Sequence, residues 1–137
     1  MRLRIAWATD PGLEREENED SVAVWRHKAG LDTLIVVCDG MGGHAAGQHA
    51  SSIAVKTVTT VLAEDGQEGP DVERLKRACK DANTAVFNAA RDNPDWSGMG
   101  STNGTFVNGE SVQEKQLNHG DRLTVGQNSV HFSVLGA

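Results

Sequence analysis

The chain has 137 residues, of which 38% are hydrophobic and 4% aromatic, and its formal net charge at pH 7 is -6. This length fits a single domain, because most domains hold roughly 100–150 residues. The negative charge argues against nucleic-acid and anionic-membrane partners, since both bind basic surfaces.

The N-terminus and the two cysteines indicate a cytoplasmic protein. The opening "MRLRIAWATD" contains only a short apolar run, so it predicts neither a signal peptide nor a membrane span. Cys38 and Cys79 lack CxxC spacing. Two reduced thiols are therefore favoured, although a disulfide stays open.

Three strands are predicted in the first forty residues. Leu3–Thr9 and Ser21–Trp25 have strand patterns, with the charged loop "DPGLEREENED" between them. The continuous apolar run Leu34–Cys38 predicts a strand buried on both faces. It ends at Asp39-Gly40.

Two helices are predicted after the glycine-rich stretch "DGMGGHAAG". Apolar residues recur at helical spacing over Ala45–Ala63 and again over Asp71–Arg91, and Asp71 is the predicted cap of the second helix. The apolar face of the second helix is predicted to hold Leu75, Cys79, Ala82, Val86 and Ala89.

The segment after "DNPDWSG" has the turn-rich pattern of a small β structure. Asn108-Gly109 in "TFVNGESV" predicts a type I′ hairpin turn between two short strands. "LNHGDRLTVG" and "QNSVHFSVLG" predict further strands. No linker separates this segment from the first, which favours one folded unit.

Acidic residues flank two of the predicted strands and suggest a metal site. Glu19 and Asp20 begin one strand and Asp39 ends another, so their carboxylates can converge as ligands for Mg²⁺ or Mn²⁺. Gly40 leaves room for its carbonyl to reach the same ion, and Arg15 can hold a phosphate. A solvated acidic loop followed by a simple Asp39-Gly40 turn is the alternative.

The strings "REENEDS" and "VVCDGMGGHAAGQHAS" resemble the first two motifs of the PPM-type (type 2C) metal-dependent serine/threonine protein phosphatases. The resemblance runs from about Ala6 to Met99. It implies that Arg15 binds phosphate and that Asp20, with Glu19 beside it, belongs to the metal site. It also implies that Asp39 bridges two metals and that Gly40 offers its carbonyl.

The same resemblance implies hydrolysis of phosphoserine or phosphothreonine by a metal-activated water, with phosphorylated proteins or peptides as partners. The family's later aspartates, in a second Asp-Gly motif and a final Asp-Asn motif, have no counterpart in this sequence. We therefore expect a weak, incomplete Mn²⁺ or Mg²⁺ site and doubtful activity.

"STNGTFVNG" and the following "LNHGDRLTVG" resemble the C-terminal part of a forkhead-associated (FHA) domain, a phosphothreonine-peptide reader. This resemblance implies peptide contacts from Thr102 and Asn103. Turn chemistry alone is the alternative explanation of these residues. The strands that carry the family's phosphate-gripping arginine and serine are absent.

The two resemblances divide the chain into a partial phosphatase segment, 1–100, and a partial FHA segment, 101–137. A chimera, a natural fusion and a truncated reading remain open. We predict an α+β fold in which helices are layered on one side of a sheet and the C-terminal hairpins complete a composite domain. A phosphatase-like enzyme, an FHA-like binding module and an inactive chimera are the functional hypotheses, and the oligomeric state is left open.

Overall fold

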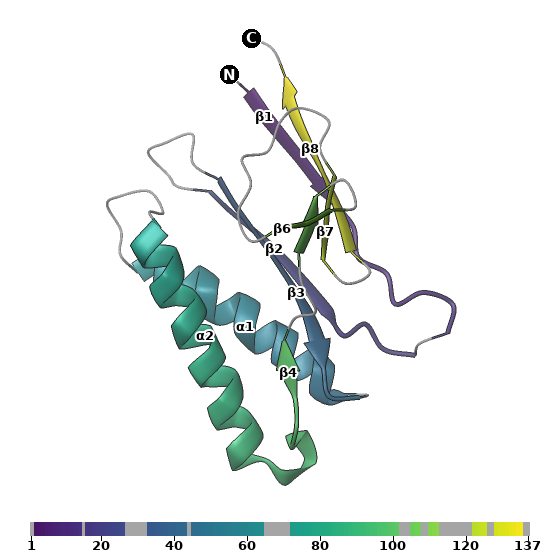
Figure 1. Ribbon diagram of the computed structural model, residues 1–137, viewed down its shortest axis with the longest axis vertical. Helices are drawn as coiled ribbons and strands as arrows, with labels where there is room; N and C mark the ends of the chain where they lie inside the picture. Colours follow the sequence, from purple (N-terminus) through teal and green to yellow (C-terminus); the bar gives the residue numbers. More distant parts are fainter. Residues whose placement is uncertain are drawn as a thin grey trace.

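The computed structural model describes residues 2–14, 16–26, 33–43, 45–64, 72–101, 105–107, 110–112, 122–125 and 128–135. Within these ranges the chain forms two β-sheets and two long α-helices, with one short 3₁₀ helix (Figure 1). The elements that carry the predicted acidic residues lie in the smaller sheet.

The smaller sheet has the strand order β2-β3-β4 and is antiparallel. β2 spans Asp20–Arg26, β3 spans Thr33–Met41 and β4 spans Gly100–Ser101. The strands predicted over Ser21–Trp25 and Leu34–Cys38 are confirmed as β2 and β3. The β-branched run of β3 suits a pleated surface.

β3 differs from its prediction in two respects. It continues through Asp39 and Gly40 to Met41, because Gly40 and Met41 pair with Ser101 and Gly100 of β4. Its residues from Thr33 to Val37 are half-buried rather than fully buried. Asp39 is therefore a residue within the strand, and the alternative of a simple turn at Asp39-Gly40 is wrong.

Helices α1 (Ala45–Glu64) and α2 (Val72–Asp92) lie within one residue of their predicted bounds. Both lie on the same side of the smaller sheet, and α1 contacts β2, β3 and α2 (Figure 1). Small side chains dominate the core between these elements and let them approach closely. Its most buried members are Ala50, Leu62, Ala78 and Ala82.

The predicted buried face of α2 is confirmed except at one position, since Leu75 and Ala89 also pack against the core. Ala78, Ala82 and Val86 are buried, whereas Cys79 is exposed. The pattern missed only Ala78, which lies beside the larger apolar residue Cys79 in the sequence. Asp71, the predicted cap, lies outside the described residues.

The larger sheet joins the N-terminal strand to the C-terminal strands in the order β1-β8-β7-β5-β6. β1 spans Arg2–Trp7 and pairs with β8, Asn128–Leu135. β7 is Arg122–Val125, and β5 (Thr105–Val107) pairs with β6 (Glu110–Val112). Because Val107 faces Glu110, the predicted hairpin is confirmed; Asn108 and Gly109 themselves lie outside the described residues.

The chain is thus a mixed α and β structure in which β2 and β3 lie between the helices and the larger sheet (Figure 1). β3 contacts β7, so the two sheets meet at the strand that carries Asp39. The layering of helices on a sheet is confirmed, while the composite domain stays a prediction. Neither α1 nor α2, the long helices among the described residues, is apolar enough over its length to cross a membrane.

Candidate metal centre

Asp20 and Asp39 lie directly opposite each other in the β2–β3 ladder. The amide of Gly40 donates to the carbonyl of Glu19 at 3.0 Å, so Glu19 and Gly40 form a hydrogen-bonded pair. Pairs alternate along an antiparallel ladder, so Asp20 and Asp39 occupy the adjacent non-hydrogen-bonded position. Opposing Cα atoms are closest there, at about 4.5 Å, and the two side chains leave the same face of the sheet.

This aspartate pair (Asp20 and Asp39) brings two carboxylates to one point on the sheet. Like charges directly opposite each other on neighbouring strands destabilise the pairing. A cation bound between them removes the repulsion, and carboxylate oxygens are the ligands that Mg²⁺ and Mn²⁺ prefer. The donor chemistry of the pair therefore fits a divalent cation.

Strand alternation separates Glu19 from the aspartate pair. The Glu19 carboxylate lies against α1, where its Oε1 is 2.9 Å from the position a β-carbon on Gly47 would take. Successive side chains of a strand point to opposite faces, so Asp20 points away from α1, to the side of the larger sheet. The structure does not bring Glu19 to the pair, although the sequence predicted all three carboxylates in one cluster.

Across the residues that the structure describes, no group of three or more His, Cys, Asp or Glu side chains is placed to hold a metal ion. The aspartate pair therefore offers a two-carboxylate site. Mg²⁺ is commonly held in proteins by one or two carboxylates together with the phosphate of a substrate and water.

Gly40 is required by the packing of β3 against α1. A β-carbon on Gly40 would overlap the carbonyl oxygen of Gly47 and lie 2.7 Å from the carbonyl oxygen of Glu19. A glycine inside a strand often marks such a close backbone approach. The Gly40 carbonyl lies 3.1 Å from the β-carbon position of Gly47, on the helix side, and its predicted role as a metal ligand stays a prediction.

The backbone of Asp20 is also held by a hydrogen bond on the side of β2 that faces away from β3. Its amide donates to Asn18 Oδ1 at 3.0 Å, and Asn18 Nδ2 donates to the Thr9 hydroxyl at 2.8 Å. β2 is the edge of its sheet, so this outward amide needs such a partner. Asn18 was not predicted as a site residue, although an Asn two residues before a strand is a recognisable Asx-turn signal.

Arg15, Thr102 and Asn103 lie outside the described residues, so their predicted contacts with phosphate and peptide stay predictions. His49, to which the sequence analysis gave no role, packs its ring against Trp96 with centroids 4.3 Å apart and planes tilted by 34°. This contact ties α1 to the 3₁₀ helix η1 (Pro94–Trp96), which leads into β4.

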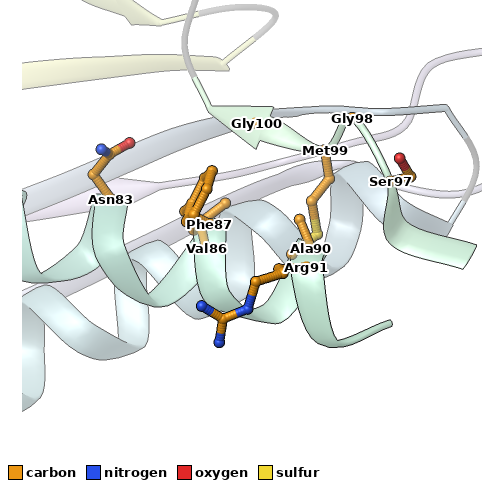
Figure 2. A pocket seen from close by; sticks show the side chains of 9 residues that line it. All are labelled: Asn83, Val86, Phe87, Ala90, Arg91, Ser97, Gly98, Met99 and Gly100. Carbon is orange, nitrogen blue, oxygen red and sulfur yellow. The ribbon is translucent and has the colours of Figure 1, made fainter. Parts of the chain in front are cut away.

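A cavity of about 360 Å³ lies between α2 and the segment that joins η1 to β4 (Figure 2). Val86, Phe87 and Met99 supply apolar walls, and Asn83 and Arg91 lie at the α2 side. Among the described residues, those predicted from the sequence to bind metal, Glu19, Asp20, Asp39 and Gly40, do not line it. The cavity is thus separate from the aspartate pair, although Gly100 in its wall pairs with Met41 of β3.

Residues 14–122 match the family model described as protein phosphatase 2C. The match continues past residue 101, where the sequence analysis placed the start of a second segment. The chain is 37% identical over 101 residues to the serine/threonine protein phosphatase PstP of Mycobacterium tuberculosis. It is 33% identical over 103 residues to the serine/threonine phosphatase stp of Listeria monocytogenes.

Two solved structures are similar over most of this chain. The PstP/Ppp phosphatase of Mycobacterium tuberculosis superposes with a TM-score of 0.56 at 34% identity, and the match covers 77% of this chain. Stp1 of Staphylococcus aureus superposes with a TM-score of 0.58 at 30% identity over 78% of this chain.

The matches cover only part of each relative. They span 18% of the curated PstP and 40% of the Listeria phosphatase, although each takes in 73% of this chain. They span 45% of both solved chains.

Proposed function

The chain belongs to the protein phosphatase 2C family, and from that premise we propose that it is a metal-dependent phosphatase-like protein acting on phosphoserine and phosphothreonine. The observation that carries the proposal is the aspartate pair, in which Asp20 and Asp39 stand opposite each other at a non-hydrogen-bonded position. Its relatives named serine/threonine phosphatases support the choice of substrate class.

Asp20 and Asp39 are the residues that would hold Mg²⁺ or Mn²⁺. A divalent cation bound there would lower the pKa of a water molecule at the site, so that this water could attack a phosphate monoester at neutral pH. The two strands fix where the carboxylates lie, and the hydrogen bond from Gly40 to Glu19 keeps their register. Arg15 is proposed to hold the substrate phosphate through its guanidinium group.

The proposal implies slow turnover and a strong dependence on the concentration of metal. Two carboxylates neutralise one divalent cation but leave most of its coordination positions to water and substrate. We therefore expect the substrate phosphate itself to contribute to metal binding, so that metal and substrate should each tighten the binding of the other.

Hydrolysis of p-nitrophenyl phosphate in Mn²⁺, Mg²⁺ or EDTA tests the proposal. We expect hydrolysis that requires the metal and falls at least tenfold in Asp39→Asn and in Asp20→Asn. Asp81→Asn is the matched control, because Asp81 lies on the exposed side of α2. Hydrolysis that survives both EDTA and Asp39→Asn would show that the aspartate pair is not the site.

Phosphopeptides then test the substrate class. We expect release of inorganic phosphate from phosphoserine and phosphothreonine peptides in preference to a phosphotyrosine peptide of the same sequence. Equal rates on all three peptides would contradict the assignment of serine and threonine substrates while leaving the metal site in place.

A further inference from the structure

Ser51 stands out as a polar side chain sealed inside the apolar core. It is 0% exposed and lies on α1, among alanine and valine side chains that face the sheet. Its hydroxyl is 2.9 Å from the hydroxyl of Ser21 in β2 and 3.2 Å from the carbonyl of Gln48. A serine hydroxyl has one proton to donate. If that proton goes to Gln48, Ser21 donates to Ser51 and both hydroxyls are satisfied.

The partner of Ser51 is the residue directly after Asp20. Ser21 and Asp20 leave opposite faces of β2, so a hydrogen bond on the Ser21 side holds the backbone from which the Asp20 carboxylate projects. Asn18 holds the same backbone at the edge of the sheet through the Asp20 amide. The position of Asp20 is therefore determined by hydrogen bonds on two sides.

The other half of the aspartate pair is held by the same helix. Gly47 contacts Gly40, the residue directly after Asp39, and Gly47 and Ser51 are four residues apart on one face of α1. Their separation along the helix axis is about 6 Å, because the rise is 1.5 Å per residue. A single rigid helix thus contacts each aspartate-bearing strand one residue beyond its aspartate.

We propose that Ser51, through its hydrogen bond to Ser21, is a positioning residue that sets the Asp20 carboxylate against Asp39 for binding a divalent cation. The inference rests on the proposed function. An apolar residue at position 51 would leave the Ser21 hydroxyl without this partner and remove the hydrogen bond that ties β2 to α1 at the residue after Asp20. Groups that hydrogen-bond directly to a metal ligand typically change metal affinity by about 10–100-fold when they are replaced. Ser51 acts through the residue next to the ligand, so the lower end of this range is expected.

Calorimetric titration of the full chain with Mn²⁺, well below the melting temperature of each variant, tests the inference. We expect Ser51→Ala and Ser21→Ala each to weaken Mn²⁺ binding about tenfold. The double variant should be no weaker than either single variant, because all three lose the same hydrogen bond. Ser52→Ala is the matched control, since Ser52 is the exposed neighbour on α1, and its affinity should equal that of the wild type.

A purely structural role for Ser51 would give a different result in the same experiment. In that case the variants melt at lower temperature but bind Mn²⁺ with wild-type affinity, and this result overturns the inference while leaving the proposed function intact. Absence of Mn²⁺ binding in the wild type overturns both. Should Ser51→Ala fail to fold, Ser21→Ala decides the matter, because it removes the same bond from a half-buried position.

Discussion

Gly40 in β3 and Gly47 in α1 face each other so closely that β3 has no room for a side chain at position 40. The contact lies one residue beyond Asp39 and places the helix directly behind the aspartate pair. It explains why a glycine stands inside a strand, where glycine is otherwise unfavourable.

The Gly40–Gly47 contact predicts that Gly40→Ala is strongly destabilising. The new methyl group would overlap the backbone carbonyl of Gly47, and backbone cannot move aside as a side chain can. We expect a loss of about 3 kcal/mol or more in the free energy of unfolding, at the upper end of the cost of overpacking. Urea unfolding followed by circular dichroism measures it.

Gly43→Ala is the control for this substitution. A β-carbon there meets nothing within 4 Å, but the φ of Gly43 is +67°, in the left-handed region. The expected cost is therefore only about 1–2 kcal/mol. Equal losses for the two variants would mean that the backbone around Gly47 gives way to the new methyl group, which would contradict the close Gly40–Gly47 contact.

The close packing of the two helices predicts that a larger side chain at Ala78 destabilises the protein. This residue is 0% exposed and lies where α2 packs on α1. Ala78→Leu should cost about 1–3 kcal/mol, because the helices must separate to admit the larger side chain. Ala63→Leu on the exposed side of α1 should change the free energy of unfolding by less than about 0.5 kcal/mol. A neutral Ala78→Leu would contradict the close packing of α1 and α2.

The ring contact between His49 and Trp96 predicts measurable coupling between the two side chains. A double-mutant cycle with His49→Ala and Trp96→Ala should give about 0.5–1.5 kcal/mol, the usual range for a pair of packed rings. A parallel cycle with Ser52→Ala in place of His49→Ala should give no coupling. Additive losses in the first cycle would show that η1 is not held to α1 through this contact.

Local patterns predicted much of the fold. Both helix ranges follow from apolar periodicity after the glycine-rich stretch "DGMGGHAAG", and the paired strands β5 and β6 follow from the hairpin signal. The pairing of β1 with β8 could not be predicted in this way, because it joins residues at opposite ends of the chain. Periodicity reports only which face of a strand is apolar, not which distant strand lies beside it.

Only part of the arrangement at the candidate site could be predicted, because local patterns do not show which elements pack against one another. The sequence pattern grouped Asp20 and Asp39 with Glu19. The sequence does not show on which face of the strand each of two adjacent acidic side chains lies, and the structure places Glu19 on the α1 side. Gly40 was predicted to offer its carbonyl to a metal, with a simple turn as the alternative, and its contact with Gly47 of α1 was not predicted. Ser51 carried no visible signal, since a serine within a helix is usually exposed.

The aspartate pair predicts that Asp39→Asn stabilises the protein when no metal is present. The substitution removes one of two like charges that face each other across β2 and β3, which relieves about 0.2–1 kcal/mol. Urea unfolding in EDTA at neutral pH measures the gain. Asp81→Asn, on the exposed face of α2, should leave the free energy of unfolding nearly unchanged. Destabilisation by Asp39→Asn in EDTA would mean that the Asp39 charge already has a favourable partner within the chain.

The most direct test of the metal centre is a thermal melt followed by circular dichroism, with EDTA or with Mn²⁺, for the wild type and Asp39→Asn. A ligand that binds only the folded state must raise the melting temperature, and the shift grows with its concentration. We expect Mn²⁺ to raise the melting temperature of the wild type and not that of Asp39→Asn. The same shift in both proteins, or none in the wild type, would contradict a divalent cation held between Asp20 and Asp39.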